Sequence, residues 1–360
     1  MTLCLQVHKK KGQDAITLLR AMKIIDKSYQ ILRKGEFLYI PILRNPSSVE
    51  LDTNLGKDWK ILETSCRKAF KRPRCLKDAL ALSLPNEVLS KLPKSLDIIG
   101  DIAILRLPKS LWDFRNSIGE GVLSLYRHIR LVMAEKGAVY GMERVRDLEI
   151  IAGTGSTETM HRENGCIFRL DVSRVYFSPR LSFERQRVAS FVGPGETVID
   201  LFSGVGPFAI QIAKRLKNGR VFAIDVNPYA VKYLMENVIE NRVQGLVTVL
   251  EGDAREVVEE RLKGIGDRII MNLPSKAFEF LDTALKALKP EGGIIHFYSF
   301  ARDPDPLKDA EETLKNWIES QGVEARVLAK RIVREIAPHK YQIVIDAFVR
   351  RRELRKKFGA

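Results

Sequence analysis

The chain has 360 residues, of which 45% are hydrophobic and 29% are charged. This composition supplies enough apolar side chains for buried cores and excludes a wholly disordered chain, and the length predicts two domains, or three if one of them is small. Sixty lysines and arginines against 45 aspartates and glutamates leave a net charge of +15, so polyanions are the expected partners.

Residues 1–70 are expected to form a small, basic α+β domain. The pattern predicts a short apolar segment, a helix and two runs that form a hairpin around Lys34-Gly35, at residues 3–7, 12–22, 29–32 and 37–42. The interval 65–94 is basic and contains several prolines, which favours a linker. We therefore place a domain boundary near residue 70.

Residues 71–170 are expected to form a second α+β domain that begins with this basic linker. A run of β-branched residues from Ile98 to Leu107 predicts one buried strand, and residues 111–134 have helical periodicity. Two further strand-like pieces lie at 145–152 and 166–172.

Residues 171–360 show regular alternation of strands and helices. The strands are predicted at 197–202, 220–225, 246–250, 267–272 and 293–300. The helices between them are predicted at 207–216, 228–241, 254–262 and 276–288. This order implies a parallel, doubly wound α/β sheet with helices on both faces. The strand-like runs 323–336 and 341–349 follow each other without a helix and predict an antiparallel hairpin at the sheet edge.

The first of these strands ends in a glycine turn, Asp200-Leu-Phe-Ser-Gly204-Val-Gly206-Pro-Phe, and a helix follows. Two glycines allow a tight turn and the close approach of a nucleotide-like cofactor to the helix N-terminus. Asp225, at the end of the next strand, can accept hydrogen bonds from ribose hydroxyls. Asp200 suits a cationic amino-acid moiety and would repel a pyrophosphate, and Asp253 can accept from an adenine amino group. These acids favour S-adenosylmethionine over NAD.

Each of these residues has a structural alternative. The spacing G-x-G-x-x-A also fits the dinucleotide fingerprint of NAD enzymes, and Asp225 could be a turn acid at a strand end. Asp253 could cap a helix with Glu256 in a capping box, and Asn272, after the fourth strand, could do the same for the next helix. Glu184 could form an i, i+4 ion pair with Arg180 on an exposed helix.

Four motifs and two upstream segments together resemble the archaeal and eukaryotic tRNA (guanine(37)-N1)-methyltransferase family. They are the glycine turn, Ala223-Ile-Asp-Val-Asn-Pro, Gly252-Asp-Ala, Met271-Asn-Leu-Pro, Thr159-Met-His-Arg-Glu-Asn-Gly and Val175-Tyr-Phe-Ser-Pro-Arg-Leu-Ser-Phe-Glu-Arg. The resemblance implies a class I S-adenosylmethionine-dependent methyltransferase, with a Rossmann-like sheet and an antiparallel C-terminal hairpin, over residues 171–360. It also implies that the two smaller domains bind tRNA.

The resemblance implies methyl transfer from S-adenosylmethionine to N1 of guanosine 37, next to the anticodon. Because N1 carries a proton, this chemistry needs a base and a group that stabilises charge on O6. The resemblance assigns Glu184 as the base and Arg144 to O6, with Arg146 as an open alternative. It places Arg180 near the cofactor and target, and it makes Asn272 the residue that orients the guanine.

The cofactor-binding residues expected from these motifs follow the strand ends. They are Asp200, Phe202, Gly204, Gly206, Asp225, Val226, Asp253, Ala254, Asn272 and Pro274. No cluster of histidines, cysteines and carboxylates predicts a bound metal, and the four cysteines form no C-x-x-C pair. We interpret the cysteines as buried structural thiols.

The expected partner is tRNA, contacted at its anticodon loop and outer corner. Four basic clusters support this: residues 9–11, residues 67–74, Arg127 with Arg130, and residues 350–357. The chain lacks a stretch of ~18 apolar residues and a signal sequence, so we expect a cytoplasmic protein without a membrane segment, and a monomer.

Several alternative functions stay open at this stage. The nearest is the sibling aminocarboxypropyl transferase of wybutosine synthesis, which the Met-Asn-Leu-Pro-Ser turn disfavours. A bifunctional enzyme that also methylates a tricyclic guanine is a second. Two alternatives come from other classes of protein. One is an NAD-dependent oxidoreductase, which would not explain the basic residues at 350–357, and the other is a catalytically silent RNA-binding protein.

Overall fold

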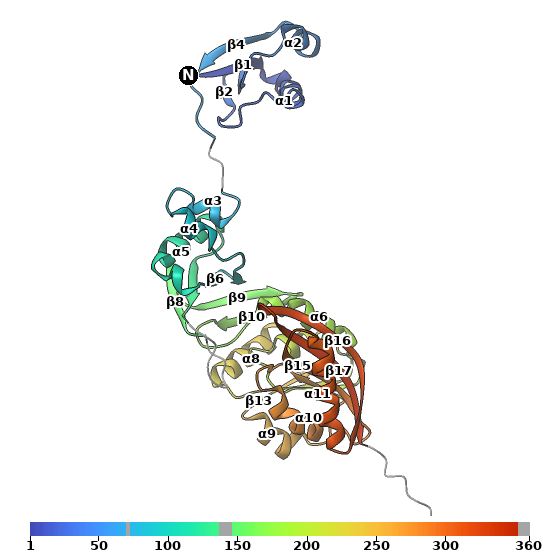
Figure 1. Ribbon diagram of the computed structural model, residues 1–360. Helices are drawn as coiled ribbons and strands as arrows, with labels where there is room; N and C mark the ends of the chain where they lie inside the picture. The colour runs from blue at the N-terminus through green and yellow to red at the C-terminus, as the bar shows by residue number, and fades with distance from the viewer. Residues whose placement is uncertain (70–72, 137–145, 352–360) are drawn as a thin grey trace, which may run out of the picture. The chain divides into compact units, whose positions relative to one another are not determined.

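The computed structural model describes residues 1–69, 73–136 and 146–351 (Figure 1). The chain divides into two compact units, Met1–Arg74 and Cys75–Ala360. We describe each unit by itself, and a further division of the second unit at residue 170 stays a prediction.

The N-terminal unit is a four-stranded sheet of order β2-β3-β1-β4 with two helices. Its elements are β1 (Thr2–His8), the short 3-10 helix η1 (Lys9–Lys11), α1 (Gly12–Ala21), β2 (Leu32–Lys34), β3 (Phe37–Pro41), α2 (Ser48–Leu55) and β4 (Trp59–Thr64). The predicted segment, helix and hairpin are present, with Gly35 at φ +60° in the turn. The pattern did not indicate α2 or β4. Of the four cysteines expected to be buried, Cys4 of this unit and Cys166 of the second unit are buried, Cys66 is half-buried and Cys75 is exposed.

The second unit begins with a sheet of order β5-β6-β7-β8. Its elements are α3 (Leu76–Leu80), α4 (Asn86–Ser90), β5 (Asp97–Ile99), β6 (Ile102–Arg106), η2 (Lys109–Phe114), α5 (Arg115–Leu125), β7 (Leu131–Glu135) and β8 (Leu148–Gly153). Leu80, Val88 and Leu89 are buried in the core of this sheet. The linker interpretation is therefore wrong for the segment that forms α3 and α4.

Two other predictions for this region are also wrong. The single strand predicted from Ile98 is a hairpin, because Gly100 turns the chain at φ +59° between β5 and β6. The helix predicted over 111–134 ends at Leu125, and β7 follows. All five residues of β7 are buried, so its apolar run resembles a buried helix and carries no alternation.

A two-stranded sheet links this region to the rest of the unit. It pairs β9 (Glu158–Glu163) with β10 (Cys166–Asp171), and the sequence pattern missed β9. Two asparagines of α8 (Pro228–Glu240 with Asn241 at its end) bind the other side of β10: Asn237 accepts from the backbone N–H of Arg169 at 2.7 Å and donates to its carbonyl at 3.0 Å, and Asn241 does the same for Ile167. These side chains satisfy the free edge of β10, which no second strand of the described residues covers.

The largest sheet has seven strands in the order β13-β12-β11-β14-β15-β17-β16. The strands are β11 (Thr197–Asp200), β12 (Arg220–Asp225), β13 (Val247–Glu251), β14 (Arg268–Met271), β15 (Gly293–Arg302), β16 (Val323–Ala337) and β17 (Lys340–Arg351). The first five are parallel to one another, and β17 runs antiparallel to both of its neighbours, β15 and β16. The predicted doubly wound sheet with a C-terminal hairpin is confirmed.

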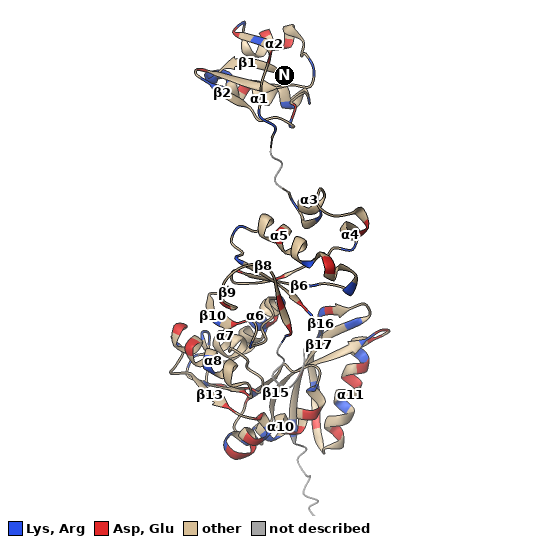
Figure 2. Ribbon diagram, turned by 90° about the vertical axis from the view of Figure 1, so that its left-hand side faces the viewer, with Lys and Arg blue, Asp and Glu red and all other residues tan. Residues whose placement is uncertain are grey.

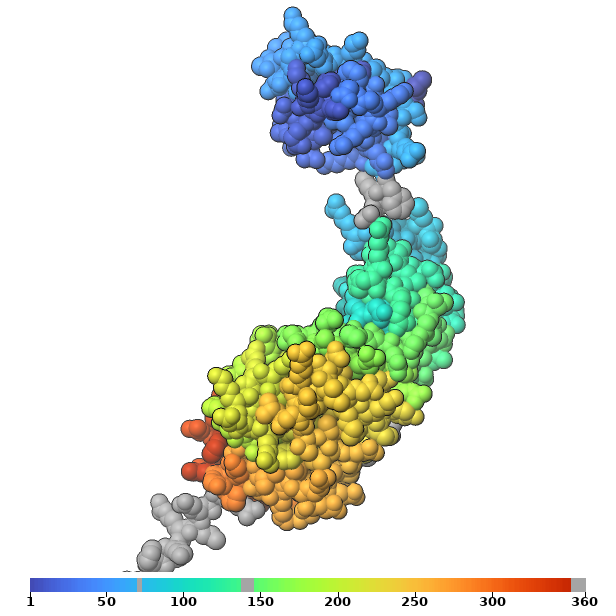
Figure 3. Space-filling model, turned by 180° about the vertical axis from the view of Figure 1, so that it is seen from behind, coloured from blue at the N-terminus to red at the C-terminus, as the bar shows by residue number. Residues whose placement is uncertain are grey.

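Helices cover both faces of this sheet (Figure 1). They are η3 (Pro179–Leu181), α6 (Ser182–Phe191), α7 (Pro207–Ala213), α8, α9 (Ala254–Val257) with the π-helix η4 (Val258–Leu262), η5 (Ala277–Phe280), α10 (Leu281–Ala287) and α11 (Pro306–Ser320). Seen from behind, the yellow and orange part of the chain, which contains α8, α9 and α10, forms a large share of the visible surface (Figure 3). One buried cluster joins the sheet to α6, α7 and α8, and another joins it to α9, α10 and α11. The sheet therefore has an apolar layer on each face.

The sequence pattern did not indicate α11. Only Ala310, Leu314 and Ile318 of this helix are buried, a narrow stripe on a mostly charged segment. Figure 2 shows both signs of charge along it, and Glu311 binds Lys315 and Lys330. In the part of the chain that the structure describes, no helix is long and apolar enough to cross a membrane.

The asparagine contacts on β10 make a testable prediction. Replacing Asn237 by leucine removes its bonds to Arg169 and to the carbonyl of Val205. Because buried backbone groups lose their partners, we expect the free energy of unfolding to fall by about 2 to 4 kcal/mol. Urea denaturation followed by circular dichroism measures this change. Asn316→Leu, on the exposed face of α11, is the matched control, and equal effects of the two variants would contradict the prediction.

Candidate active site

A pocket opens at the carboxyl ends of the parallel strands β11, β12, β13 and β14. Its lining comes from the turns after these strands and from the segment before α6. The lining residues are Tyr176, Phe177, Leu181, Arg185, Leu201, Phe202, Ser203, Gly204, Pro207, Phe208, Asp225, Val226, Asn227, Ala230, Gly252, Asp253, Ala254, Asn272, Leu273, Lys276 and Phe280. This is where open α/β sheets bind their ligands.

The glycine turn has the geometry that the sequence predicts. Gly206 caps α7 at φ +90°, and a Cβ atom there would lie 2.3 Å from Cδ1 of Leu234, so only glycine fits. Gly204, at φ +54°, lines the pocket, and its N–H donates to Oδ2 of Asp225 at 2.7 Å. Asp225 therefore holds the turn against the end of β12 while its side chain faces the pocket.

The acid after β13 has both of its proposed roles available. Asp253 caps α9 by accepting from the N–H of Arg255 at 2.8 Å, and the Arg255 guanidinium binds the same carboxylate. The hydrogen bond from Arg255 holds the pKa of Asp253 below its usual range. Asp253 also lines the pocket, so the helix cap and a contact with an adenine amino group are compatible.

Asp200 is the last residue of β11, directly before the glycine turn, and does not line the pocket. Its side chain is fully buried, Oδ1 accepts weakly from the N–H of Phe202 at 3.4 Å, and Oδ2 has no hydrogen-bond partner. Burial, with a contribution from the charge of Asp225, raises the pKa of Asp200 to about 7. A buried carboxylate with an unused oxygen next to the turn is suited to a cationic ligand group.

Seven of the ten residues expected to bind cofactor line the pocket. They are Phe202, Gly204, Asp225, Val226, Asp253, Ala254 and Asn272. Asp200, Gly206 and Pro274 do not line it: Asp200 ends β11, Gly206 caps α7, and Pro274 is buried in the turn after β14. The pocket thus gathers residues from four loops that are separate in the sequence.

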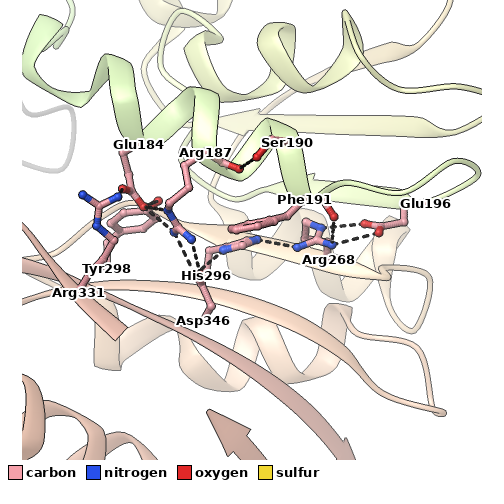
Figure 4. A network of polar contacts seen from close by, with 10 residues as sticks. All are labelled: Glu184, Arg187, Ser190, Phe191, Glu196, Arg268, His296, Tyr298, Arg331 and Asp346. Atoms are coloured by element: carbon pink, nitrogen blue, oxygen red, sulfur yellow. Dashed lines mark hydrogen bonds and ion pairs between the residues drawn. The ribbon is translucent and has the colours of Figure 1, made fainter. Parts of the chain in front are cut away.

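Glu184 lies in the first turn of α6, between the pocket residues Leu181 and Arg185, and does not itself line the pocket. Its side chain is 2% exposed and is bound by Arg187 and by the hydroxyl of Tyr298 (Figure 4). The alternative of an exposed pair with Arg180 is wrong, because Arg180 binds Asp97 at 2.6 Å.

Of the two arginines considered for O6, only one is described. Arg144 lies outside the described residues. Arg146 is buried, donates to the carbonyl of Phe177 at 3.0 Å and lies over the ring of Tyr176, with its guanidinium 5.1 Å from the ring centre. It also shares Asp97 with Arg180 in a pair of ion contacts. These contacts bring both arginines to the segment that forms one wall of the pocket.

Several functional contacts were not predicted from the sequence. Arg334 on β16 donates to the hydroxyls of Tyr176 and Ser178 and to Gln342, and Gln342 approaches Oδ1 of Asn272 at 3.4 Å. Nothing in the local pattern of β16 and β17 connects them to a pocket far away in the sequence. Only the antiparallel hairpin brings them to Asn272.

Arg185, also missed, is buried at the pocket wall. Both oxygens of Glu163 accept from its Nη1, at 2.9 and 2.7 Å, and its guanidinium lies 4.5 Å from the ring centre of Phe177. Burial lowers the pKa of this arginine. One signal in the sequence pointed to this contact. Glu163 lies in the motif Thr159-Met-His-Arg-Glu-Asn-Gly, and a buried arginine needs a carboxylate partner of this kind.

The residues present fit S-adenosylmethionine. The orphaned Oδ2 of Asp200 suits its amino group, Asp225 suits ribose hydroxyls, and the lining around Phe202, Val226 and Phe280 is apolar enough for an adenine ring. Within the described residues, no group of three or more histidines, cysteines and carboxylates lies together as metal ligands would.

Fold and pocket together define a class I S-adenosylmethionine-dependent methyltransferase. Comparison with known proteins specifies the family. Three protein-family models match this chain. The TRM5/TYW2 methyltransferase domain matches residues 159–327, the TYW2 N-terminal domain matches residues 76–157, and the tRNA methyltransferase 5 N-terminal domain matches residues 4–50. The chain belongs to the tRNA (guanine(37)-N1)-methyltransferase family, and it is an enzyme of that class.

Three relatives illustrate this similarity. The tRNA (guanine(37)-N(1))-methyltransferase Trm5b of Pyrococcus abyssi is 39% identical, over 96% of this chain and 98% of the relative. The structure of aTrm5 in complex with tRNALeu superimposes with a TM-score of 0.82 at 34% identity and covers 96% of this chain and 99% of that one. The aminocarboxypropyltransferase for 4-demethylwyosine of Pyrococcus horikoshii is 32% identical over 76% of this chain and 96% of the relative.

The buried carboxylate of Asp200 predicts a pH dependence of stability. Its pKa is about 7 in the folded chain against 3.8 normally, so the folded state holds a proton that the unfolded state has lost. Stability should therefore fall as the pH rises from about 4 to 7, and Asp200→Asn should remove this loss. We expect the cofactor-free variant to melt roughly a few degrees above the parent at pH 8.

Differential scanning calorimetry at several pH values between 5 and 8.5 measures this difference. Asp309→Asn, which changes an exposed carboxylate of α11, is the control and should follow the parent. Parallel profiles for Asp200→Asn and the parent would show that Asp200 does not carry the dependence.

Proposed function

We propose that this chain transfers the methyl group of S-adenosylmethionine to N1 of guanosine 37 in tRNA, with Glu184 as the general base. The observation that carries the assignment of the base is the position of Glu184 between Leu181 and Arg185, two residues of the pocket wall. The family membership, over nearly the whole chain, supports the reaction itself.

The residues of the glycine turn and the neighbouring loops would hold the cofactor. Asp225 would accept from the ribose hydroxyls, Asp253 from the adenine amino group, and Asp200 would face the amino group of the methionine moiety. When bound, the cofactor supplies an electrophilic methyl group on a sulfonium. The apolar lining from Phe202 and Phe280 would exclude water from it.

Methyl transfer to N1 requires removal of the N1 proton. That proton passes to the carboxylate of Glu184, and the electron pair left on N1 forms the bond to the methyl carbon. The electron pair of the carbon–sulfur bond returns to sulfur, so S-adenosylhomocysteine is released. The pair on N1 is otherwise delocalised into the lactam, so negative charge shifts to O6 as the proton leaves.

A cation close to O6 would stabilise this charge. We assign Arg144 to this role. We also propose that Asn272 orients the guanine edge and that Arg180 lies near the target base. The buried contacts of Arg146 with Phe177 and Tyr176 favour a supporting role for that arginine in the pocket wall.

The N-terminal unit and the basic residues would bind tRNA away from the target base. We propose contacts with the anticodon loop and the outer corner of tRNA, a monomeric enzyme, and action in the cytoplasm. Not every basic residue is available for this: Arg130 is bound to Asp101 and to the carbonyls of Ser156 and Glu158, which gives it a structural role. Phosphate contacts make the affinity fall with salt concentration.

The share of this chain that aligns with each relative distinguishes methyl transfer from the related aminocarboxypropyl transfer. The aminocarboxypropyltransferase aligns with 76% of the chain, whereas Trm5b of Pyrococcus abyssi aligns with 96%. The N-terminal unit contains the match to the tRNA methyltransferase 5 N-terminal domain. This coverage favours methyl transfer over aminocarboxypropyl transfer, and the methyltransferase domain disfavours an NAD-dependent oxidoreductase.

Glu184→Gln tests the base assignment. Because glutamine cannot accept the N1 proton, we expect methylation to fall about 100-fold or more. The assay follows labelled methyl transfer to tRNA transcripts with G or A at position 37, with nucleoside analysis for N1-methylguanosine. Only the G transcript should react.

Glu240→Gln, at the exposed end of α8, is the matched control and should keep the parent rate. Full activity of Glu184→Gln would overturn the assignment of the base. Label at another nucleoside would overturn the proposed target while leaving the cofactor assignment intact.

A further inference from the structure

The two carboxylate oxygens of Glu184 have different surroundings. Oε1 accepts three hydrogen bonds, from Nε and Nη2 of Arg187 at 2.9 and 2.6 Å and from the hydroxyl of Tyr298 at 2.9 Å. Oε2 is buried and accepts none, although Nη1 of Arg331 lies 3.1 Å away as an ion pair. Three donors occupy the lone pairs of Oε1, so Oε2 is the oxygen on which a proton can be received.

Arg187 is itself held from the other side. Its Nη1 donates to Oδ2 of Asp346 at 2.5 Å, and its Nη2 lies 3.3 Å from Oδ1. A bidentate pair of this kind fixes the plane of the guanidinium as well as its position. Both side chains are buried to about nine tenths, at 11% and 6% exposure. The position of Glu184 therefore depends on a carboxylate of β17.

Asp346 receives a hydrogen bond from a histidine on the neighbouring strand. Nδ1 of His296 lies 2.6 Å from Oδ1 of Asp346, and the two residues are paired across β15 and β17. On the far side of the ring, Nη1 of Arg268 lies 2.9 Å from Nε2. Because a guanidinium can only donate, Nε2 must accept, and the single ring proton lies on Nδ1 and points at Asp346.

Other observations support a neutral histidine in this place. Burial lowers the pKa of His296, which favours the uncharged ring. Burial by itself would raise the pKa of Asp346, but the bonds from His296 and Arg187 lower it to about 2, so this carboxylate stays ionised. Arg268 is anchored in turn by Glu196 and by the carbonyl of Phe191, the last residue of α6. Figure 4 shows the whole series of contacts.

A buried series of hydrogen-bonded charged residues costs desolvation free energy. Apolar side chains of similar volume often stabilise a fold equally well. This series runs from Arg268 through His296, Asp346 and Arg187, and it ends on Glu184. Tyr298 reaches the same oxygen from β15 and packs against Phe208 in the pocket wall, with ring centres 5.9 Å apart. The series therefore ends on the carboxylate of Glu184, whose partner Tyr298 packs against a residue of the pocket wall.

We propose that Tyr298 and Arg187, with Arg187 held by Asp346 and His296, are positioning residues that fix Oε1 of Glu184 and leave Oε2 to receive the N1 proton. This inference rests on the proposed function of Glu184 as the base. It adds residues from β15 and β17 to the active site, none of which touches the substrate.

The inference predicts a change in the pH dependence of the reaction. The groups that face Glu184 are Arg187 from its own helix, Tyr298 from β15 and Arg331 from β16, with Asp346 of β17 behind Arg187. All the donors bind the ionised carboxylate more strongly than the protonated one. Removing a donor makes protonation easier, so the acid limb of the pH–rate profile moves to higher pH.

The test is single-turnover methylation of the G37 transcript at saturating S-adenosylmethionine, from pH 5 to 9. For Tyr298→Phe we expect the acid limb to move up by about half a unit to one unit, so that the rate on that limb falls about 3- to 10-fold. Asp346→Asn frees Arg187 but also removes a negative charge, so for this variant we expect a lower rate across the whole profile. The KM for tRNA should not change. Tyr298→Phe loses one hydroxyl and keeps its ring in the core, so it is the variant on which the test depends if Asp346→Asn does not fold.

Tyr233→Phe is the matched control, because Tyr233 is also a buried tyrosine whose hydroxyl donates to a glutamate, Glu158, at 2.6 Å. Its profile should equal that of the parent. In a Glu184→Gln background, Tyr298→Phe should cause no additional loss, because the oxygen that it positions no longer acts as a base.

The outcomes separate this inference from the proposed function. If Glu184→Gln is inactive but Tyr298→Phe and Asp346→Asn keep the parent profile, the positioning role is wrong and the base assignment stands. If Glu184→Gln is fully active, the base assignment is wrong and the positioning role falls with it. An additional loss for Tyr298→Phe in the Glu184→Gln background would show that Tyr298 acts elsewhere.

Discussion

Charged side chains of α6 lie buried between this helix and the strands around it, and each has a partner of opposite charge. Arg185 is bound by Glu163 of β9, and Arg187 is bound by Glu184 and Asp346. A buried charge without such a partner costs several kcal/mol, so these pairs fix how α6 lies on the sheet. Since α6 begins at the pocket wall, they also fix one side of the active site.

The topology of the sheet divides this site into two parts. The parallel strands end in loops that form the cofactor pocket, as in other doubly wound proteins. The antiparallel β16–β17 hairpin contributes Arg331, Arg334, Gln342 and Asp346, which reach Glu184 and the segment around Tyr176. In the proposed mechanism, the parallel half of the sheet would hold the cofactor and the antiparallel half would arrange the groups around Glu184.

Two acidic residues of the pocket each stabilise the local backbone and also line the pocket. Asp225 holds the glycine turn through Gly204 and faces the pocket, and Asp253 caps a helix while lining the same pocket. Such residues keep their positions without a ligand, so little ordering is needed when the cofactor binds. Asp200 is the exception, because one of its oxygens has no hydrogen-bond partner and its pKa is raised.

The sequence by itself determined the doubly wound fold, the C-terminal hairpin and the cofactor loops. Glycine turns and acids at strand ends act through contiguous residues, so Gly204, Asp225 and Asp253 could be found without the fold. The pattern failed for β7, where burial on both faces removes alternation, and for α11, where the apolar stripe is narrow. Tertiary structure decided which local arginine binds Glu184, and it added the distant partners Tyr298 and Arg331. The local pattern offered Arg180, but Arg187 is its partner and Asp346, 159 residues further along the chain, holds Arg187 in place. Only the pairing of β15 with β17 brings that carboxylate to α6, because the charge balance of a buried site depends on residues that the chain order keeps far apart.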